Sequence, residues 1–184
     1  MVVRGKLKQL LFPFLSRWYE KSNGRKQTYK NKGISMSILP EVFHPGYFLS
    51  TNILLDFISS KDVNNKRVIE LGAGSGFISF YLAKNCGANV IASDINPNAL
   101  EGLKLNSEKL QIPIEVVESN LFENIDLENV DLILINPPYY PKEVLNTRDA
   151  AFYCGADFDY FKRLFEGLKK GGMDYSVFMI LSED

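Results

Sequence analysis

The sequence predicts an α/β protein built on a doubly wound, mostly parallel β-sheet. From about residue 66, short apolar runs alternate with segments in which apolar residues recur every three or four positions, a pattern typical of parallel strands joined by helices. A glycine-rich stretch follows the first of these runs, and an aspartate follows the second. With 184 residues, 46% of them hydrophobic, the chain is long enough to bury one core.

Five apolar runs are the predicted strands of this sheet. Their length and their content of β-branched residues fit strands that are buried on both faces. They are residues 67–71 (RVIEL), 89–93 (NVIAS), 114–118 (IEVVE), 131–135 (DLILI) and 175–181 (YSVFMIL).

Capping residues predict where several helices begin. Asn96 and Pro97 indicate a helix that runs to about residue 110, with an N-cap followed by a proline at the first helical position. Ser50 or Thr51 is the expected cap of a helix over residues 52–59. Asp157 is the expected cap of the last helix, which ends at a glycine pair. Its apolar stripe is predicted to face the core and consists of Phe158, Phe161, Leu164, Phe165 and Leu168.

The net charge of −1 hides an asymmetry along the chain. Residues 1–33 contain nine Lys or Arg and one acidic residue, a net charge of +8, whereas residues 34–184 have a net charge of −9. A basic arm that also contains Trp18, Tyr19 and Tyr29 suits a phosphate backbone with bases stacked on its rings. Packing of this arm on the acidic body of its own chain is an equally simple explanation.

Composition argues against a metal site and a membrane span. Cys86 and Cys154 lie far apart, neither has a second Cys or His at metal-ligand spacing, and His44 is the only histidine. The apolar run over residues 10–15 is interrupted by Pro13 and is too short to span a membrane. We therefore expect a soluble cytoplasmic protein with no metal and no membrane partner.

The first predicted strand leads directly into a glycine loop. Gly72, Gly74 and Gly76 allow a tight turn and the close approach of a ligand, although packing of a helix on a strand also uses such glycines. Phe77 stands where a dinucleotide fingerprint requires its third glycine, which disfavours an oxidoreductase. Asp94, at the end of the second predicted strand, would lie beside this loop and can accept hydrogen bonds from two ribose hydroxyls.

The fourth predicted strand ends in an unusual tetrapeptide. Strand formation does not require Asn136, Pro137, Pro138 and Tyr139 at this place, because both prolines remove backbone donors. A loop that merely leaves a strand also uses Asn and Pro. The position of the tetrapeptide, after a glycine loop and an acid in this order, favours a binding or catalytic site.

These stretches resemble the motifs of class I S-adenosylmethionine-dependent methyltransferases, in the branch with an Asn-Pro-Pro-Tyr signature. The matching segments are VIELGAGSGFIS, IASDINP, ESNLF and LILINPPYY, on successive predicted strands. That branch includes methyltransferases of adenine and guanine amino groups, and the release-factor glutamine methyltransferases with their small-domain relatives. The resemblance implies a Rossmann-like fold and S-adenosylmethionine as cofactor. Together with the charge asymmetry, it divides the chain into a basic arm (1–33), a cofactor-covering segment with a helix (34–65) and a C-terminally incomplete catalytic domain (66–184).

The resemblance also implies which residues bind the cofactor. The methionine part of the cofactor would be lined by Glu70, Gly72, Gly74 and Gly76. Asp94 would hold the ribose, and Ile95 would lie against the adenine. Asn120 stands where the family more often has Asp, and it would bind the adenine amino group with Leu121 packed nearby. The full set is Glu70, Gly72, Gly74, Gly76, Asp94, Ile95, Asn120 and Leu121.

The tetrapeptide that ends the fourth strand suits methyl transfer to nitrogen. The Asn136 side-chain oxygen and the Pro137 carbonyl can accept two hydrogen bonds from a planar NH₂ group, and Tyr139 offers a face for stacking. Consecutive prolines, Pro137 and Pro138, fix the backbone so that this carbonyl points into the site. We expect an N-methyltransferase acting on an amino or amide nitrogen of a macromolecule.

The basic arm slightly favours RNA or DNA as the methyl acceptor. A protein glutamine side chain is the close alternative, and a non-catalytic, cofactor-binding partner subunit is a further one. Residues 148–160 are expected to form a mobile segment that faces the substrate.

The sheet is expected to lack the last two strands of this fold, because the chain ends just after the fifth predicted strand. One explanation is a truncated polypeptide. The alternative is that residues 25–43 form a hairpin that covers the exposed sheet edge in place of the missing strands.

Overall fold

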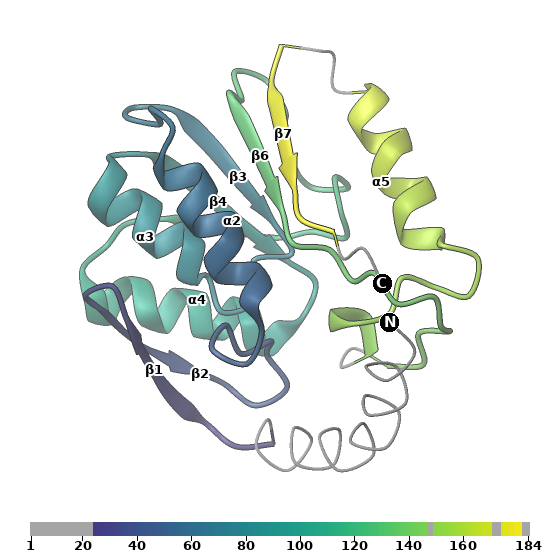
Figure 1. Ribbon diagram of the computed structural model, residues 1–184, viewed down its shortest axis with the longest axis horizontal. Helices are drawn as coiled ribbons and strands as arrows, with labels where there is room; N and C mark the ends of the chain where they lie inside the picture. The colour runs from purple at the N-terminus through teal and green to yellow at the C-terminus, as the bar shows by residue number, and fades with distance from the viewer. Residues whose placement is uncertain (1–23, 147–148, 171–173, 182–184) are drawn as a thin grey trace, which may run out of the picture.

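The central element of the fold is a five-stranded parallel sheet (Figure 1). The computed structural model describes residues 24–146, 149–170 and 174–181. The order across the sheet is β5-β4-β3-β6-β7, and every neighbouring pair is parallel. The strands are β3 (Arg67–Leu71), β4 (Asn89–Asp94), β5 (Glu115–Glu118), β6 (Leu132–Ile135) and β7 (Ser176–Met179). Each agrees with a predicted apolar run to within two residues, and the predicted α/β class is confirmed.

The strand order reverses at β3, which pairs with β4 on one side and with β6 on the other. The loop after β3 therefore starts next to the loop after β6, at the carboxyl edge of the sheet. Open α/β sheets bind their ligands at such a switch point. This topology brings the predicted glycine loop and the Asn136 tetrapeptide to one place.

Both faces of the sheet are buried, which explains why its strands are continuously apolar. Side chains alternate between the faces, so that Val68 and Ile69 of β3 enter different cores. The first core lies under α2 (Leu49–Ser59), α3 (Phe77–Cys86) and α4 (Pro97–Leu110). The second lies under α5 (Asp159–Lys170) and contains its buried residue Leu164.

The predicted start of α4 is confirmed. The Asn96 side chain accepts a hydrogen bond from the backbone N–H of Asn98 at 2.9 Å, and Pro97 is the first helical residue. For α2, the predicted cap at Ser50 or Thr51 is wrong. The helix already begins at Leu49, and Phe48 precedes it without a side-chain cap, because a phenyl ring has no oxygen to accept a backbone N–H.

The start of α5 also differs from the prediction. Phe158, expected inside the helix, has φ +57° and lies before it, so that Asp157 is not the residue that adjoins the first turn. The stripe is only partly buried, since Phe158 and Phe165 are exposed whereas Leu164 is fully buried. Helical spacing alone therefore predicted a wider core face than the sheet covers.

Residues 27–38 form a hairpin, in which β1 (Gln27–Asn31) pairs antiparallel with β2 (Ile34–Ile38). Its two-residue turn has positive φ at both Lys32 and Gly33, the conformation that suits a tight hairpin. β1 falls within the segment that the sequence assigned to the basic arm. Residues 1–23 of that arm lie outside the described residues.

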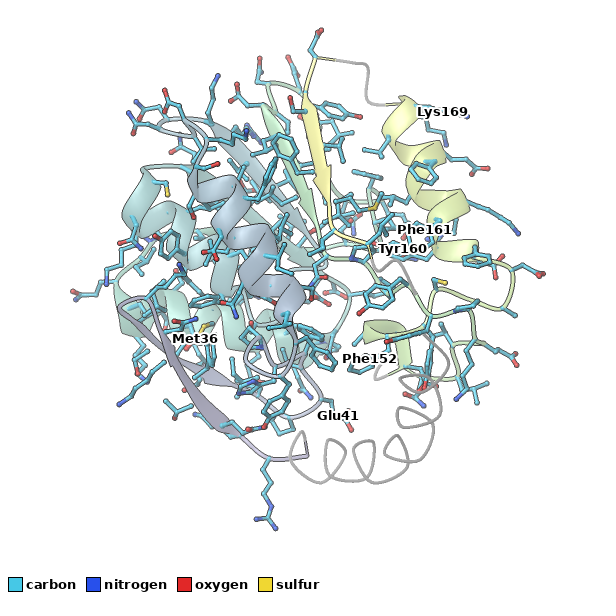
Figure 2. All side chains as sticks on the ribbon, in the orientation of Figure 1. Met36, Glu41, Phe152, Tyr160, Phe161 and Lys169 are labelled. Atoms are coloured by element: carbon cyan, nitrogen blue, oxygen red, sulfur yellow. The ribbon has the colours of Figure 1, made fainter. Side chains whose placement is uncertain are left out.

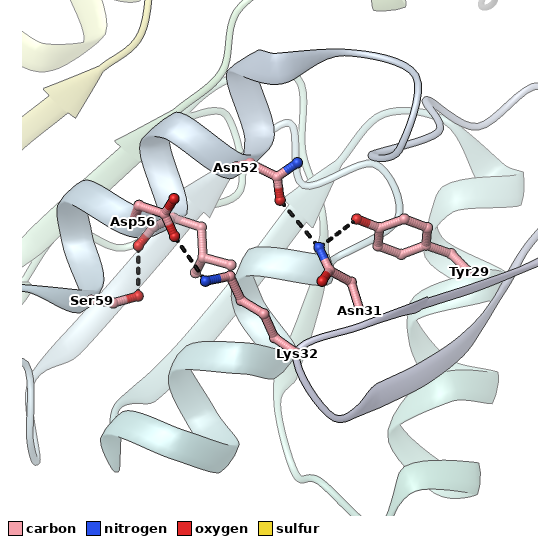
Figure 3. Close-up of polar contacts among 7 residues, drawn as sticks. Tyr29, Asn31, Lys32, Asn52, Asp56 and Ser59 are labelled. Carbon is pink, nitrogen blue, oxygen red and sulfur yellow. Dashed lines mark hydrogen bonds and ion pairs between the residues drawn. The ribbon is translucent and has the colours of Figure 1, made fainter.

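The hairpin packs on the helical layer, and the prediction that it covers the sheet edge is wrong. β2 contacts α4 and α3, and the Asn106 amide of α4 bonds both backbone groups of Ser37, at 2.8 and 2.7 Å. The hairpin turn is tied to α2 by Lys32, which forms an ion pair with Asp56 at 2.8 Å (Figure 3). Figure 1 shows β7 on the other side of α2 from this hairpin.

Within residues 24–146, 149–170 and 174–181, no helix combines the length and the apolar character that a membrane crossing requires.

Candidate active site

A cavity of about 630 Å³ lies at the carboxyl edge of the sheet, where the loops after β3, β4, β5 and β6 meet. Its volume falls within the range of about 300–1,000 Å³ that is common for ligand pockets. Ten of the twelve residues that the sequence singled out line it: Gly72, Gly74, Asp94, Ile95, Asn120, Leu121, Asn136, Pro137, Pro138 and Tyr139.

Glu70 and Gly76 do not lie among the residues that line the cavity. Glu70 is buried, and its carboxylate accepts hydrogen bonds from the backbone N–H and the hydroxyl of Ser79, in the first turn of α3. Burial raises the pKa of Glu70 to about 7, against the effect of these bonds. Gly76 has φ +76°, and a Cβ there would collide with Leu103. Both residues are therefore connected with the start of α3: Glu70 is bonded to its first turn, and Gly76 directly precedes the helix.

Asp94 joins two of the loops that form the cavity. One carboxylate oxygen accepts the N–H of Gly74 at 2.7 Å, and the other accepts the N–H of Asn96 at 2.9 Å. Burial raises the pKa of Asp94, while its bonds to backbone N–H groups lower it. A carboxylate has about four acceptor positions, so these backbone donors leave acceptor capacity for a hydroxyl group of a ligand. Beside it, Ile95 is 47% exposed and offers apolar surface to a flat ring.

The loop after β5 is fixed by Ser119, which the sequence reasoning missed. Its N–H donates to the carbonyl of Asp94 at 3.0 Å, and its hydroxyl donates to the carbonyl of Leu121 at 2.8 Å. The same hydroxyl accepts the N–H of Asn124 at 3.0 Å. Leu121, within this turn, has φ +56°. A serine directly after a strand, followed by a polar turn, is a local signal that could have identified it.

The tetrapeptide after β6 is tied to the segment that precedes α5. Tyr140 donates its N–H to the carbonyl of Phe152 at 3.2 Å, and Cys154 donates to the carbonyl of Tyr140 at 3.0 Å. The rings of Tyr139 and Tyr140 lie 4.8 Å apart. Residues 150–156 line the cavity, on the same side as the tetrapeptide. Arg148, at the start of the predicted substrate-facing segment, lies outside the described residues.

Three phenylalanine rings form another part of the wall, and they come from the segments expected to cover the cofactor and to face the substrate, although the sequence did not single out these residues. Phe43 stacks on Phe48 with ring centroids 4.9 Å apart, and Phe152 lies 6.0 and 5.9 Å from them. The segment that carries the first two rings is held by α4, because Asn96 donates its side-chain N–H to the carbonyl of Glu41 at 3.0 Å. Figure 2 shows Glu41 and Phe152 near one another on this side of the molecule.

Tyr160, in the first turn of α5, also lines the cavity. Burial, followed by the negative charge of Asp94, raises the pKa of its phenol. His44 lies outside the wall and is a packing residue, since its ring stacks on Tyr47 at 4.0 Å and its Nδ1 accepts the N–H of Gly46. The described part of the chain has no cluster of three or more His, Cys, Asp or Glu placed to hold a metal ion.

The geometry fits an adenosine-containing ligand: a glycine loop, an acid beside it and an exposed apolar side chain follow one another along the wall. A family model described as the methyltransferase small domain matches residues 35–152. The chain belongs to the methyltransferase small-domain family. It is therefore an S-adenosylmethionine-dependent methyltransferase, and the predicted cofactor is confirmed.

Several relatives of this methyltransferase have curated names. A protein from Methanocaldococcus jannaschii, provisionally named a protein N5-glutamine methyltransferase, is 37% identical over 151 residues, which cover 77% of this chain and 74% of that protein. A release factor glutamine methyltransferase from Dictyoglomus turgidum is 34% identical, covering 64% and 46%. A ribosomal RNA small subunit methyltransferase C from Buchnera aphidicola is 35% identical, covering 55% and 33%. The chain spans less than half of the last two proteins.

Solved structures share the fold. The T. thermophilus 16S rRNA N2 G1207 methyltransferase, solved with AdoMet and guanosine, superimposes with a TM-score of 0.55 at 24% identity, covering 70% of this chain and 37% of that one. The Pyrococcus abyssi tRNA (uracil-54, C5)-methyltransferase gives a TM-score of 0.52 at 22% identity, covering 62% and 28%. The Rossmann-like class I methyltransferase fold is thereby confirmed. The methyl acceptor is a macromolecule, protein or RNA, in the named relatives.

Proposed function

We propose that this methyltransferase transfers a methyl group to a planar amide or amino nitrogen of a macromolecule. The observation that carries the proposal is the position of Asn136 and Pro137, which follow β6 on the wall of the cavity that Asp94 and the glycine loop also line. The Asn136 oxygen and the Pro137 carbonyl would accept the two hydrogens of an NH₂ group. They would hold its lone pair in line and stabilise the positive charge that develops on nitrogen.

S-adenosylmethionine supplies an electrophilic methyl group, so the chain's own residues have mainly to bind and orient. We assign the ribose to Asp94, the adenine to Ile95, Asn120 and Leu121, and the methionine part to Gly72 and Gly74. Glu70 and Gly76 would act indirectly, by holding the glycine loop. Pro138 would keep the backbone of the acceptor site rigid, and Tyr139 would stack on the planar acceptor group.

The leading acceptor is the side-chain amide of a protein glutamine. It is favoured by the relative with the provisional N5-glutamine name, which matches over about three quarters of both chains. The alternative is an amino group of a nucleic-acid base. It is favoured by the +8 charge of residues 1–33 and by the aromatic rings of the wall, which suit a flipped-out base.

A methyl-transfer assay tests the reaction and the acceptor together. The full chain is incubated with labelled S-adenosylmethionine and, separately, with protein and RNA extracts. Products are then digested and analysed for N5-methylglutamine and for methylated nucleosides. We expect N5-methylglutamine. Methylated nucleosides would establish the alternative, and cofactor binding without any product would indicate a non-catalytic partner subunit.

Asn136→Ala should lower the transfer rate at least about 100-fold, because it removes an acceptor that acts on the reacting nitrogen. The dissociation constant for S-adenosylhomocysteine should change less than about threefold. Asn85→Ala is the matched control, since Asn85 is exposed on α3 and lies outside the cavity wall. An active Asn136→Ala variant would contradict the assigned role.

A further inference from the structure

The side chain of Asn120 poses an orientation problem that an aspartate would not have. It lines the cavity directly after Ser119, at the place assigned to the adenine of the cofactor. The exocyclic amino group of adenine is a hydrogen-bond donor. An amide has one accepting end and one donating end, so only its oxygen can receive that donor. A freely turning amide would present the wrong end part of the time.

The structure contains a partner that distinguishes these two ends. The Asn120 Nδ2 donates to Oε1 of Glu123 at 3.2 Å. An ionised carboxylate only accepts hydrogen bonds, so Glu123 can hold the nitrogen of the amide but cannot hold its oxygen. With Nδ2 engaged in this way, Oδ1 is the end left for a ligand in the cavity.

Glu123 is itself held from a different element. Arg163 of α5 forms an ion pair with the same carboxylate oxygen, with Nη2 and Oε1 3.1 Å apart, and Arg163 also lines the cavity. The loop lies directly against this helix, because the Phe122 ring occupies the space that a side chain at Gly167 would need. Glu123 is thereby placed between the loop after β5 and α5.

This arrangement contributes little to folding stability. The side chains of Arg163 and Glu123 are 49% and 61% exposed, and exposed ion pairs typically contribute less than about 1 kcal/mol. The effect of these contacts is on orientation instead. Because the Glu123 carboxylate only accepts hydrogen bonds, it holds the Asn120 amide with its nitrogen toward Glu123.

We propose that Glu123, held by Arg163, is a positioning residue that fixes the Asn120 amide with its oxygen toward the adenine amino group. This inference rests on the proposed assignment of the adenine to Asn120. The pair makes the cofactor site selective for a 6-amino purine over a 6-oxo purine, whose oxygen needs a donor instead. An aspartate at position 120 could accept the adenine amino group with either oxygen. Asparagine can do so with only one atom, and Glu123 holds the amide so that this atom faces the ligand.

Calorimetric titration with two ligands tests the proposal: S-adenosylhomocysteine and its 6-oxo analogue, S-inosylhomocysteine. The quantity measured is the ratio of their dissociation constants. We expect the wild type to prefer the adenosyl ligand by at least about tenfold, and Glu123→Ala to lower this preference about fivefold, the effect of about one neutral hydrogen bond. Glu128→Ala, which removes an exposed acid outside the wall of the cavity, should leave the ratio unchanged.

A rescue variant separates orientation from general damage to the loop. Asn120→Asp needs no orienting partner, because both of its oxygens accept. The double variant Asn120→Asp/Glu123→Ala should therefore regain the wild-type preference. A loop damaged by the loss of Glu123 would not recover in this way.

The outcomes distinguish this inference from the function on which it rests. A folded wild type that binds neither ligand would overturn the cofactor assignments themselves. Wild-type selectivity that persists in Glu123→Ala would overturn only the role of Glu123. Selectivity that is lost in Glu123→Ala and not restored in the double variant would show a structural effect and would also overturn it.

Discussion

Glu70 and Asp94 are both acids near the ends of adjacent strands, yet they have different surroundings. The resemblance to methyltransferases assigned both to the cofactor. In the structure, the Asp94 carboxylate lies on the cavity wall, whereas Glu70 is 6% exposed and is bonded to Ser79. Both side chains lie on the same face of the sheet, because Glu70 is in register with Ala92, two residues before Asp94. They differ in position along the strands: Glu70 lies within β3, whereas Asp94 ends β4 at the carboxyl edge of the sheet, and this register is not contained in the sequence pattern alone.

The raised pKa of Glu70 predicts how the free energy of unfolding changes with pH. In the unfolded chain this carboxyl group titrates near 4.5, and in the folded chain near 7. Between these values the folded state binds more protons, so this group's contribution to stability falls as the pH rises from 4.5 to 7. Glu70→Gln should remove the effect, so that the variant gains about 3 kcal/mol relative to wild type over this interval.

Urea denaturation of both chains at pH 5, 6 and 7 measures this difference. Ser79 can still donate to the amide oxygen of glutamine, so the local bonds are not all lost. Stability curves that stay parallel over this pH range would show that Glu70 titrates near its ordinary value.

At the scale of elements, the sequence predicted correctly those strands and helix ends that depend on residues close together in the chain. The strands and the start of α4 needed only apolar runs and the Asn96 cap, and both were predicted correctly. The starts of α2 and α5 were not predicted correctly. Phe48, which has no side-chain acceptor, precedes α2, and Phe158, with φ +57°, lies directly before α5. Capping rules favour polar residues and therefore pointed to neighbouring positions in both cases.

The same division applies to the candidate site. Residues directly after strands were predictable, because the carboxyl ends of parallel strands meet at one edge of the sheet. Phe152, Tyr160 and Arg163 reach the cavity from the region between β6 and β7. Phe152 and Tyr160 belong to the segment expected to face the substrate, but no motif singled out these side chains or Arg163, because their positions depend on how the chain folds back over the tetrapeptide.

The contact between α5 and the loop after β5 predicts an unusual glycine effect. Gly167 lies inside α5, where exchange of glycine for alanine commonly stabilises a helix by about 1 kcal/mol. Here the new Cβ would collide with the Phe122 ring. Gly167→Ala should therefore destabilise the protein by about 1–3 kcal/mol, the usual cost of overpacking.

Thermal or urea denaturation checks the sign of this change. Glu166→Ala is the control, since Glu166 is the exposed neighbour on the same helix. A stabilised Gly167→Ala variant would mean that the Phe122 ring can move away without cost, and that the loop is not held against α5 in this way.

At the scale of the whole molecule, the cavity unites segments from distant parts of the chain. Its wall includes residues 41–43 ahead of the parallel sheet, the ends of four strands and the first turn of α5. The two cores bury opposite faces of one sheet, so the loops at its carboxyl edge are held from both sides. A cofactor bound there would contact the loops after β3, β4 and β5 at the same time.

This organisation predicts which backbone amides a ligand protects from hydrogen exchange. The N–H of Gly74 and the N–H of Ser119 are both bonded to Asp94, and both lie at the proposed adenosine site. With S-adenosylhomocysteine at 100 times its dissociation constant, exchange through local opening should slow up to about 100-fold at both amides. Amides of β1 and β2 that exchange by local opening should not change, because the hairpin packs on the helices away from the cavity. Exchange followed by mass spectrometry, with Asp94→Ala as a variant that should lose the protection, makes the comparison. Protection at Gly74 without protection at Ser119 would mean that the ligand does not bridge the loops after β3 and β5, and the assignment of the adenine to Asn120 would then fail.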